Sequence, residues 1–376
     1  MNTLDIRLLE KNIDDVADYD FLNNKVFGSA YYVYQKGSIV FEKCYGKTGL
    51  PGDNVKNNTI FRLASMTKPI TAFSALILAE RGLLSLDDNV GKYLPEFNNV
   101  HVIDADGNDL GTPKHLPSLR NILSHCSAIG SNPQKMARMT VEQKQTIDSS
   151  IDFLIGAGLD FEPATAQQYS GVGAFDVLVK IIEMVSGKDF QSFLTEEIFV
   201  PCEMVDTTFV PSKEQYKRFI KMHGRNDNGE NYEFKMFDGC TFGDFPCTHF
   251  LGGAGLVSTL KDYGNFAKML LNKGNFNGKQ LLKEETFSLL CTPQVPQSIM
   301  DWNERWGLGV RVICKEEYPY LPVGTFGWSG AFGSHFWVDP VNEIVAVFMK
   351  NSAVDGGSAN ESAQNFEKAV YSSFNI

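Results

Sequence analysis

Ser65 and Lys68 are the two residues of this 376-residue chain whose types and spacing most directly suggest chemistry. They stand three positions apart in the tetrapeptide SMTK, at the start of an apolar segment. Residues three apart on a helix share one face, so the lysine nitrogen would lie beside the serine hydroxyl. A serine hydroxyl needs a neighbouring base to become a nucleophile, and a lysine can serve when burial lowers its pKa. The pair therefore predicts acyl transfer through a covalent serine ester.

The same spacing occurs a second time, from Ser258 to Lys261 in STLK, which shows how little it proves alone. This copy precedes DYGNFAKMLL, so Ser258 or Thr259 is predicted to cap a helix with Lys261 in solvent. On spacing alone, a capping role is equally open for Ser65. The apolar segment after Ser65 distinguishes it, because it predicts a buried helix and hence a buried lysine.

The segment that must position this pair begins with the strand-like TIFRLA and continues as a buried helix over about 65–80, before Gly82. Pro69 is tolerated in its first turn, where free N–H groups offer a donor for an oxyanion. A hairpin is predicted over 29–46, turning at Gly37. Further predictions are helices over 176–185, 190–199 and 366–374, strands over 324–340 and 343–351, and a packed aromatic loop over 234–250.

Sheet at both ends of the chain with helices between predicts an α/β (α+β) protein. We expect an α/β lobe built from about 1–90 and 255–376, with a mainly helical lobe inserted over about 91–254. Hydrophobic residues make up 43% of the chain, enough to bury a large core. The whole of 1–376 is therefore interpreted as a single catalytic module.

The charge and the cysteines restrict the partners and the compartment. A net charge of -11 and a pI near 5.1 disfavour nucleic acid and anionic membranes as partners. The acidic N-terminus does not resemble a signal peptide, and no apolar stretch reaches transmembrane length. The seven cysteines are scattered without metal-binding or redox spacing, so we expect a cytoplasmic protein without metal or cofactor. A disulfide between Cys240 and Cys247 is the less favoured alternative.

The residues around Ser65, LASMTKPITAFSALILAERGLLSLDDNVGKYLPEF, closely resemble the nucleophile segment of class C β-lactamase-like serine hydrolases. That family includes β-lactamases, D,D-peptidases and family VIII esterases. Three further segments resemble it in the same order: LRNILSHCSAIG, FEPATAQQYSGVGAFDVLVKIIEMVSGKDF and GGAGLVSTLKDYGNFAKMLL. The resemblance covers most of the chain from about residue 60 onward. It implies a β-lactamase/penicillin-binding-protein-like fold, with an antiparallel sheet flanked by helices, and an acyl-enzyme at Ser65.

By the same resemblance, the family's second motif begins at Tyr169 in QQYSG. The tyrosine of that motif shares proton transfer with the lysine, which makes Tyr169 a candidate catalytic residue. A buried aromatic at a turn is the alternative. In β-lactamases the motif usually ends in an asparagine that holds the substrate's side-chain amide. Gly171 stands at that position here, so this contact is lost.

The third motif aligns with Trp328, Ser329 and Gly330, on an edge strand that lines the cleft in the family. Relatives usually carry a Lys or His at the first position, and this cation helps to position substrate carboxylates. Trp328 offers an apolar face instead, although it is also compatible with an ordinary packed strand. The resemblance implies an oxyanion hole made by the N–H groups of Ser65 and Ala331, with Gly330 letting the substrate approach the strand.

Both departures favour neutral esters, and a Trp at this place is familiar from family VIII esterases. We therefore expect a carboxylesterase acting on short-chain esters, with Lys68 and Tyr169 moving protons to and from Ser65. One alternative is a β-lactamase or a D-amino-acid or D,D-peptidase. Another, from a different class, is a catalytically silent ligand-binding protein of the same fold. The expected partner is a small-molecule ester or amide, and the oligomeric state is left open.

Four histidines are weaker candidates. His125 in SHCS resembles a family position that is structural, so we expect it to donate a hydrogen bond to backbone. His249 and His335 lie in segments that can approach the cleft, so a Ser-His-Asp triad stays open, although no GxSxG motif surrounds any serine. His223, beside Gly224 and Arg225, is predicted to lie at the surface.

Overall fold

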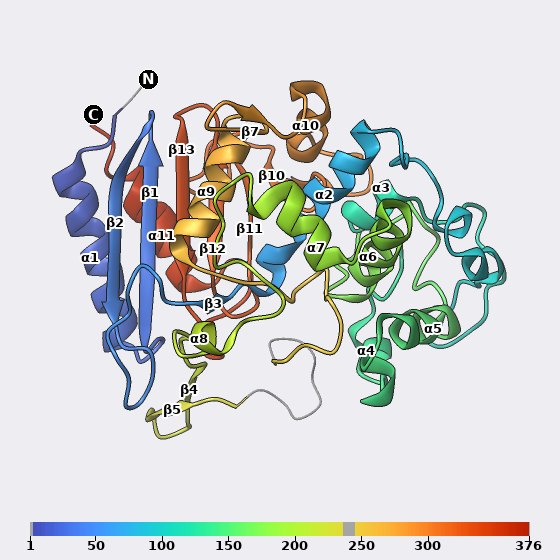
Figure 1. The fold of residues 1–376 in the computed structure, drawn as a ribbon, viewed down its shortest axis with the longest axis horizontal. Coiled ribbons are helices and arrows are strands. Elements are labelled where there is room, and N and C mark those ends of the chain that lie inside the picture. Colours follow the sequence, from blue (N-terminus) through green and yellow to red (C-terminus); the bar gives the residue numbers. More distant parts are fainter. Residues whose placement is uncertain (1–2, 236–244, 376) are drawn as a thin grey trace.

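The structure, a computed structural model, describes residues 3–235 and 245–375 and contains one large antiparallel sheet (Figure 1). Its strand order is β2-β1-β13-β12-β11-β10-β9. The strands are β1 (Gly28–Gln35), β2 (Ser38–Gly46), β9 (Glu304–Trp306), β10 (Arg311–Ile313), β11 (Phe326–Ser329), β12 (His335–Asp339) and β13 (Ile344–Met349). Because β1 pairs with β13, segments from the two ends of the chain lie side by side. The predicted antiparallel sheet is confirmed.

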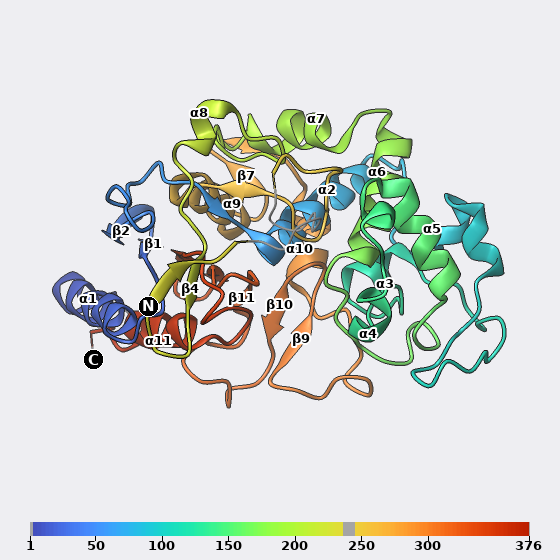
Figure 2. The same cartoon turned by 90° about the horizontal axis from the view of Figure 1, so that it is seen from below.

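Helices cover both faces of this sheet, and the alternation of side chains along β1 shows the two cores. Tyr31 packs with α1 (Ile6–Leu22) and α11 (Glu361–Tyr371) on one face, whereas Tyr32 faces the core that holds α9 (Leu260–Leu271) and α2 (Lys68–Glu80). Tyr263 of α9 meets Phe336 of β12 edge to face, with ring centroids 5.0 Å apart. Figure 2 shows α1 and α11 together on their side of the sheet.

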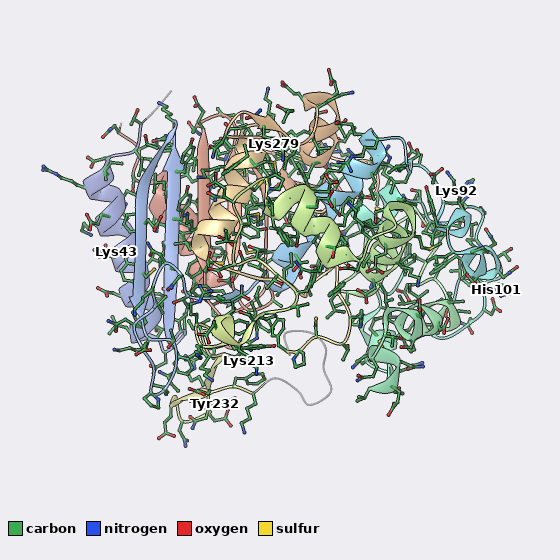
Figure 3. All side chains as sticks on the ribbon, viewed as in Figure 1. Lys43, Lys92, His101, Lys213, Tyr232 and Lys279 are labelled. Carbon is green, nitrogen blue, oxygen red and sulfur yellow. The ribbon has the colours of Figure 1, made fainter. Side chains whose placement is uncertain are left out.

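The middle of the chain forms a mainly helical region beside the sheet (Figure 1). It contains η2 (Val90–Lys92), η3 (Pro95–Asn99), α3 (Leu119–Leu123), α4 (Pro133–Met136), η4 (Glu142–Lys144), α5 (Ile147–Ala157), α6 (Gly173–Ser186), α7 (Phe190–Leu194) and the short π-helix η5 (Thr195–Phe199). The short helix α8 (Lys213–Tyr216) lies apart from this region, on the side of the sheet (Figure 1). Lys92 and His101 mark this end of the molecule, and Lys43 on β2 marks the opposite end (Figure 3).

Smaller elements complete the fold. They are β3 (Phe61–Arg62) paired with β6 (Val257–Ser258), β4 (His223–Arg225) with β5 (Asn231–Glu233), β7 (Asn275–Phe276) with β8 (Lys279–Gln280), and the helix α10 (Glu284–Cys291). None of the described helices is long and apolar enough to cross a membrane. The six described cysteines are free thiols, whereas Cys240 lies outside the described residues.

Most predicted elements are present, with shifted ends. The hairpin turns at Gly37, whose φ is +87°, and α6 ends at Gly187, whose φ is +69°, as glycine at a helix end allows. The sequence patterns predict neither α1 nor the short strands β9 and β10. The predicted loop over 234–250 falls largely outside the described residues, and the lobe boundaries near 90 and 255 stay predictions.

Candidate active site

Ser65 lies in a short 3-10 helix, η1 (Ala64–Thr67), which leads directly into α2. The predicted helix over 65–80 therefore begins with a tighter turn, in which side chains three positions apart lie one above the other. This geometry places the Nζ of Lys68 3.3 Å from the Oγ of Ser65. Just before them Ala64 has a φ of +48°, a left-handed conformation that costs free energy in any residue with a side chain. The chain thus turns sharply at Ala64, just before Ser65.

Hydrogen bonds from residues 252–256 and from α9 hold this turn in place. Leu63 N–H donates to the carbonyl of Leu256 at 2.9 Å, and Leu256 N–H donates to Thr67 Oγ1 at 3.2 Å. The hydroxyl of Tyr263 donates to the carbonyl of Met66 at 2.8 Å. Because the backbone on either side of Ser65 is tied to other elements, its hydroxyl has a fixed position.

Lys68 is fully buried, and its ammonium nitrogen is surrounded by acceptors. Nζ donates to the carbonyl of Gly171 at 2.6 Å and to that of Gly253 at 2.9 Å. It also lies over the rings of Tyr169 and Phe175, 4.8 and 5.1 Å from their centroids. Burial lowers the pKa of Lys68 below its ordinary value, and the nearby Tyr169 phenol opposes this. A lysine with a lowered pKa can act as a base.

The two carbonyls also orient the amine. A neutral lysine has two N–H bonds and one lone pair, and the carbonyls of Gly171 and Gly253 take the two N–H bonds. The lone pair is then left facing the third close neighbour, the Oγ of Ser65. Gly253 permits this approach, because a Cβ built there would lie 2.8 Å from the Gly171 oxygen and 3.2 Å from Nζ. The arrangement can therefore accept the Ser65 proton.

Tyr169 lies beside Lys68 in a group of aromatic rings. Trp328 Nε1 donates to the Tyr169 hydroxyl at 3.3 Å. The rings of Trp306 and Trp328 meet edge to face with centroids 4.5 Å apart, and both contact Tyr169, at 5.8 and 5.5 Å. We call Tyr169, Trp306 and Trp328 the aromatic cluster. Both tryptophans are buried, so the cluster forms a rigid apolar surface next to the reacting groups.

The third motif divides its side chains between the two faces of the sheet. Trp328 points to the aromatic cluster, but Ser329 points to the opposite face, where its hydroxyl lies 2.8 Å from Nδ1 of His335. A Cβ on Gly330 would lie 2.4 Å from the carbonyl oxygen of Leu63, so this glycine lets the strand approach η1. No described residue accepts a hydrogen bond from the N–H of the exposed Ala331. That N–H is available to an oxyanion.

His335 forms a row with Ser329 and Glu367 that resembles a catalytic triad in composition alone. His335 Nε2 lies 3.0 Å from Glu367 Oε1, and all three residues are at most 3% exposed. The row lies next to α11 on the face of the sheet opposite to Tyr169, and Ser329 and His335 are buried there. Its hydrogen bonds tie β11 to β12 and α11.

The other histidines have different places. His249 Nε2 lies 3.5 Å from the buried carboxylate of Asp176. His125 accepts a hydrogen bond from the N–H of Ser170 at 3.2 Å, so the expected donation to backbone is reversed. The expectation of a surface position for His223 is wrong. That residue is fully buried, because its ring packs edge to face on the ring of Phe27.

Comparison with known proteins identifies the family. The family model described as Beta-lactamase matches residues 9–369 of the chain. The chain belongs to this family.

The names of the relatives record more than one activity. Esterase EstB of Burkholderia gladioli is 26% identical over an alignment of 386 positions, which covers 95% of this chain and 94% of that protein. The D-alanyl-D-alanine-carboxypeptidase/endopeptidase AmpH of Escherichia coli is 31% identical over 211 residues, 55% of this chain and 52% of AmpH. Among solved structures, EstCE1, described as a hydrolase with promiscuous acyltransferase activity, superimposes with a TM-score of 0.78 at 22% identity, covering 97% of this chain and 99% of its own. The octameric penicillin-binding protein homologue from Pyrococcus abyssi gives a TM-score of 0.73 at 21% identity, over 97% of this chain and 76% of its own.

These findings confirm the resemblance and the β-lactamase/penicillin-binding-protein-like fold. They also support the coarser functional statement, that the chain is a serine hydrolase of β-lactamase type. The esterase and D,D-peptidase relatives leave the particular substrate open.

Several residues of the site were not found from the sequence. Trp306 lies on β9, a strand too short to give a period-two pattern. Gly253 and Phe175 contact Lys68 from segments distant in sequence, and spacing along the chain carries no information about such contacts. Within residues 3–235 and 245–375, no three His, Cys, Asp or Glu side chains form a group that could hold a metal ion.

Proposed function

We propose that this member of the Beta-lactamase family is a carboxylesterase that hydrolyses short-chain esters through an acyl-enzyme at Ser65. One observation carries the proposal: Trp306 and Trp328 pack on Tyr169 and present an apolar aromatic surface beside the Ser65–Lys68 pair. A cation at the first position of the third motif would favour substrates that carry a carboxylate. An indole there favours neutral, apolar groups.

In the proposed acylation step, the Ser65 oxygen attacks the ester carbonyl while its proton passes to the amine of Lys68, directly or through the Tyr169 hydroxyl. The Oγ–Nζ distance of 3.3 Å supports this transfer. The negative charge that develops on the carbonyl oxygen would be stabilised by the N–H groups of Ser65 and Ala331. The N–H of Ser65 belongs to the first turn of η1, where backbone donors have no partner within the helix.

The leaving alcohol then takes the proton, and a water molecule attacks the acyl carbon to regenerate Ser65. Lys68 and Tyr169 serve both steps in reverse order, since the proton removed from water must return to the serine oxygen. The Trp328 N–H that donates to the Tyr169 hydroxyl holds the phenol in place.

The relatives support the choice of substrate in part. EstB, whose name records an esterase, is similar over 95% of this chain, whereas AmpH is similar over only 55%. A β-lactamase or D,D-peptidase needs contacts for an amide and a carboxylate. The positions of Gly171 and Trp328 provide neither through a side chain.

The decisive experiment compares the purified protein with its Ser65→Ala variant on p-nitrophenyl acetate, p-nitrophenyl butyrate and a chromogenic cephalosporin. We expect rapid turnover of both esters, little opening of the cephalosporin, and loss of turnover in Ser65→Ala by at least about 10³-fold. Ester turnover that survives in Ser65→Ala would remove Ser65 as the nucleophile.

Two other outcomes select the alternatives. Faster opening of the cephalosporin than of either ester would favour a β-lactamase or peptidase. Absence of turnover together with absence of covalent labelling of Ser65 would favour a ligand-binding protein.

A cytoplasmic location belongs to the same proposal. The free thiols of the six described cysteines support it, and cell fractionation tests it.

A further inference from the structure

His125 makes hydrogen bonds on both sides of Tyr169. Its backbone carbonyl accepts from the N–H of Gln168 at 3.0 Å, and its ring Nδ1 accepts from the N–H of Ser170 at 3.2 Å. Its ring also lies against the Tyr169 ring, with centroids 4.5 Å apart. One residue therefore binds the backbone N–H groups of both sequence neighbours of Tyr169 and packs on the face of its ring.

The backbone of His125 is unusual for a residue with a large side chain. Its φ is +59°, in the left-handed region, and the side chain is buried just after α3. Such a conformation persists only where the surrounding structure compensates for it. Here the compensation includes the two hydrogen bonds to the segment that carries Tyr169.

The hydrogen bond from Ser170 also fixes the protonation state of the ring. Nδ1 accepts, so the ring proton must lie on Nε2, which has no partner among the described residues. Burial, together with the positive charge of Lys68, lowers the pKa of His125 well below its ordinary value. A protonated ring would lose the acceptor and place a second cation close to Lys68.

We propose that His125 is a positioning residue, whose Nδ1 acceptor holds the Tyr169 hydroxyl in register with Lys68 and Trp328. The proposal rests on the proposed role of Tyr169 in proton transfer. Because the phenol oxygen lies far from the backbone, a small rotation of the 168–170 segment moves it away from the lysine. Misplacement of a reacting group by about 1 Å can cost on the order of 10²-fold in rate.

Two substitutions separate the acceptor from the ring. His125→Phe keeps an aromatic ring but removes the acceptor, whereas His125→Asn keeps an acceptor near Nδ1 and tolerates a left-handed φ but removes the ring. In His125→Phe we expect kcat for p-nitrophenyl butyrate to fall about 10²-fold, with KM changed less than threefold. In His125→Asn we expect kcat to fall less than tenfold. A packing role predicts the reverse ranking, because Asn leaves a cavity beside Tyr169, Phe175 and Trp306. The reverse ranking, or equal rates, would overturn the proposal.

If His125→Phe does not fold, His125→Asn is compared with His125→Ala, since both lack the ring and only Asn has the acceptor. The proposal requires Asn to be at least about tenfold faster, and equal rates contradict it. His223→Phe and His223→Asn are matched controls, because His223 is as buried as His125. Its ring is hydrogen-bonded to Asn231 and Ser352 and not to residues of the site. Melting curves of all variants identify effects that arise from stability alone.

A second readout distinguishes failure of this proposal from failure of the proposed function. The rate at which a fluorophosphonate labels Ser65 depends on activation of its hydroxyl but not on the natural substrate. If the protein labels but hydrolyses no ester, the esterase proposal fails while the ranking of labelling rates still tests His125. If the unsubstituted protein does not label, both proposals are wrong.

Discussion

The carbonyl oxygen of Gly171 accepts a hydrogen bond from the Nζ of Lys68 at 2.6 Å. The resemblance to β-lactamases implies a substrate-holding side-chain amide at this position, whereas here the backbone carbonyl of Gly171 binds the lysine. A Cβ built on Gly171 would meet no described atom within 4 Å. The position thus keeps a contact with the base and leaves space on its other side.

Gly253→Ala should impair turnover, because the added methyl group would lie 3.2 Å from Nζ of Lys68 and 2.8 Å from the Gly171 oxygen. Displacement of the amine from Ser65 is expected to lower kcat for p-nitrophenyl butyrate on the order of 10²-fold. Gly156→Ala is the control, since Gly156 lies within α5 and a Cβ added there would meet no atom within 4 Å. It should leave kcat unchanged and stabilise the fold by roughly 0.5 kcal/mol. Equal kcat values for the two variants would contradict the orientation of Lys68 by the two carbonyls.

Trp328→Phe keeps an apolar ring but removes the N–H that donates to the Tyr169 hydroxyl. Loss of one such hydrogen bond, worth about 1 kcal/mol, should lower kcat/KM about fivefold. Trp306→Phe is the comparison, because the Trp306 indole donates to no described acceptor and contributes through ring contacts. We expect it to change KM more than kcat. Steady-state kinetics on p-nitrophenyl butyrate measures both, and a larger kcat effect in Trp306→Phe would refute the role given to the Trp328 N–H.

The pH dependence of turnover should report the buried lysine. If the amine of Lys68 accepts the Ser65 proton, kcat/KM must rise with pH as Lys68 loses its own proton. Because burial lowers the pKa of Lys68, this rise should be centred below the ordinary lysine pKa of about 10.4. Lys68→Arg, which stays protonated, should lose both the activity and the rise. A pH-independent kcat/KM in the unsubstituted protein from pH 5 to 10 would argue against a lysine base.

The same lowered pKa makes stability depend on pH. Lys68 binds its proton less readily in the folded protein than in the unfolded chain, where the lysine pKa is about 10.4. Between the two values the unfolded chain holds more protons, so the free energy of unfolding rises with pH. Lys68→Met lacks this group, and the unsubstituted protein should therefore gain stability relative to Lys68→Met as the pH rises toward 10.4. Urea denaturation of both proteins at several pH values measures the difference, and a trend of the opposite sign would exclude a lowered pKa.

Ser329→Ala tests the buried row of Ser329, His335 and Glu367. Removal of the hydroxyl leaves Nδ1 of the buried His335 without its partner, which should destabilise the fold by about 1–3 kcal/mol. Ester turnover by the folded variant should change little, because the row lies on the opposite face of the sheet from Tyr169. Thermal denaturation and kinetics together decide this. Loss of turnover at unchanged stability would mean that the row takes part in catalysis.

The control pair in the sequence shows what local patterns can predict. Thr259 caps α9, its hydroxyl accepts from the N–H of Asp262, and Lys261 is exposed, all as predicted for STLK. The helix after Ser65 is also where its apolar residues predict it. These features depend on residues within one or two turns, for which sequence spacing is sufficient.

The remaining features depend on contacts across the fold. The carbonyls that bind Lys68 come from Gly171 and Gly253, which are distant from it in sequence. The mistaken surface position of His223 has the same origin, because its burial depends on Phe27 and on Ser352 at the other end of the chain. The sheet face to which Ser329 points follows from the register of β11 against β12, which no pattern within β11 reveals.

The contact of Gly330 with Leu63 has a consequence for how the protein is made. The two N–H groups proposed to bind the oxyanion lie on segments from opposite ends of the chain, and they meet through a gap that only a glycine fits. During synthesis, the nucleophile segment and the helical region emerge long before β11 exists. Ser65 therefore lacks its proposed second oxyanion donor until residue 331 has been made, and a chain that stops before this residue is expected to be inactive on esters.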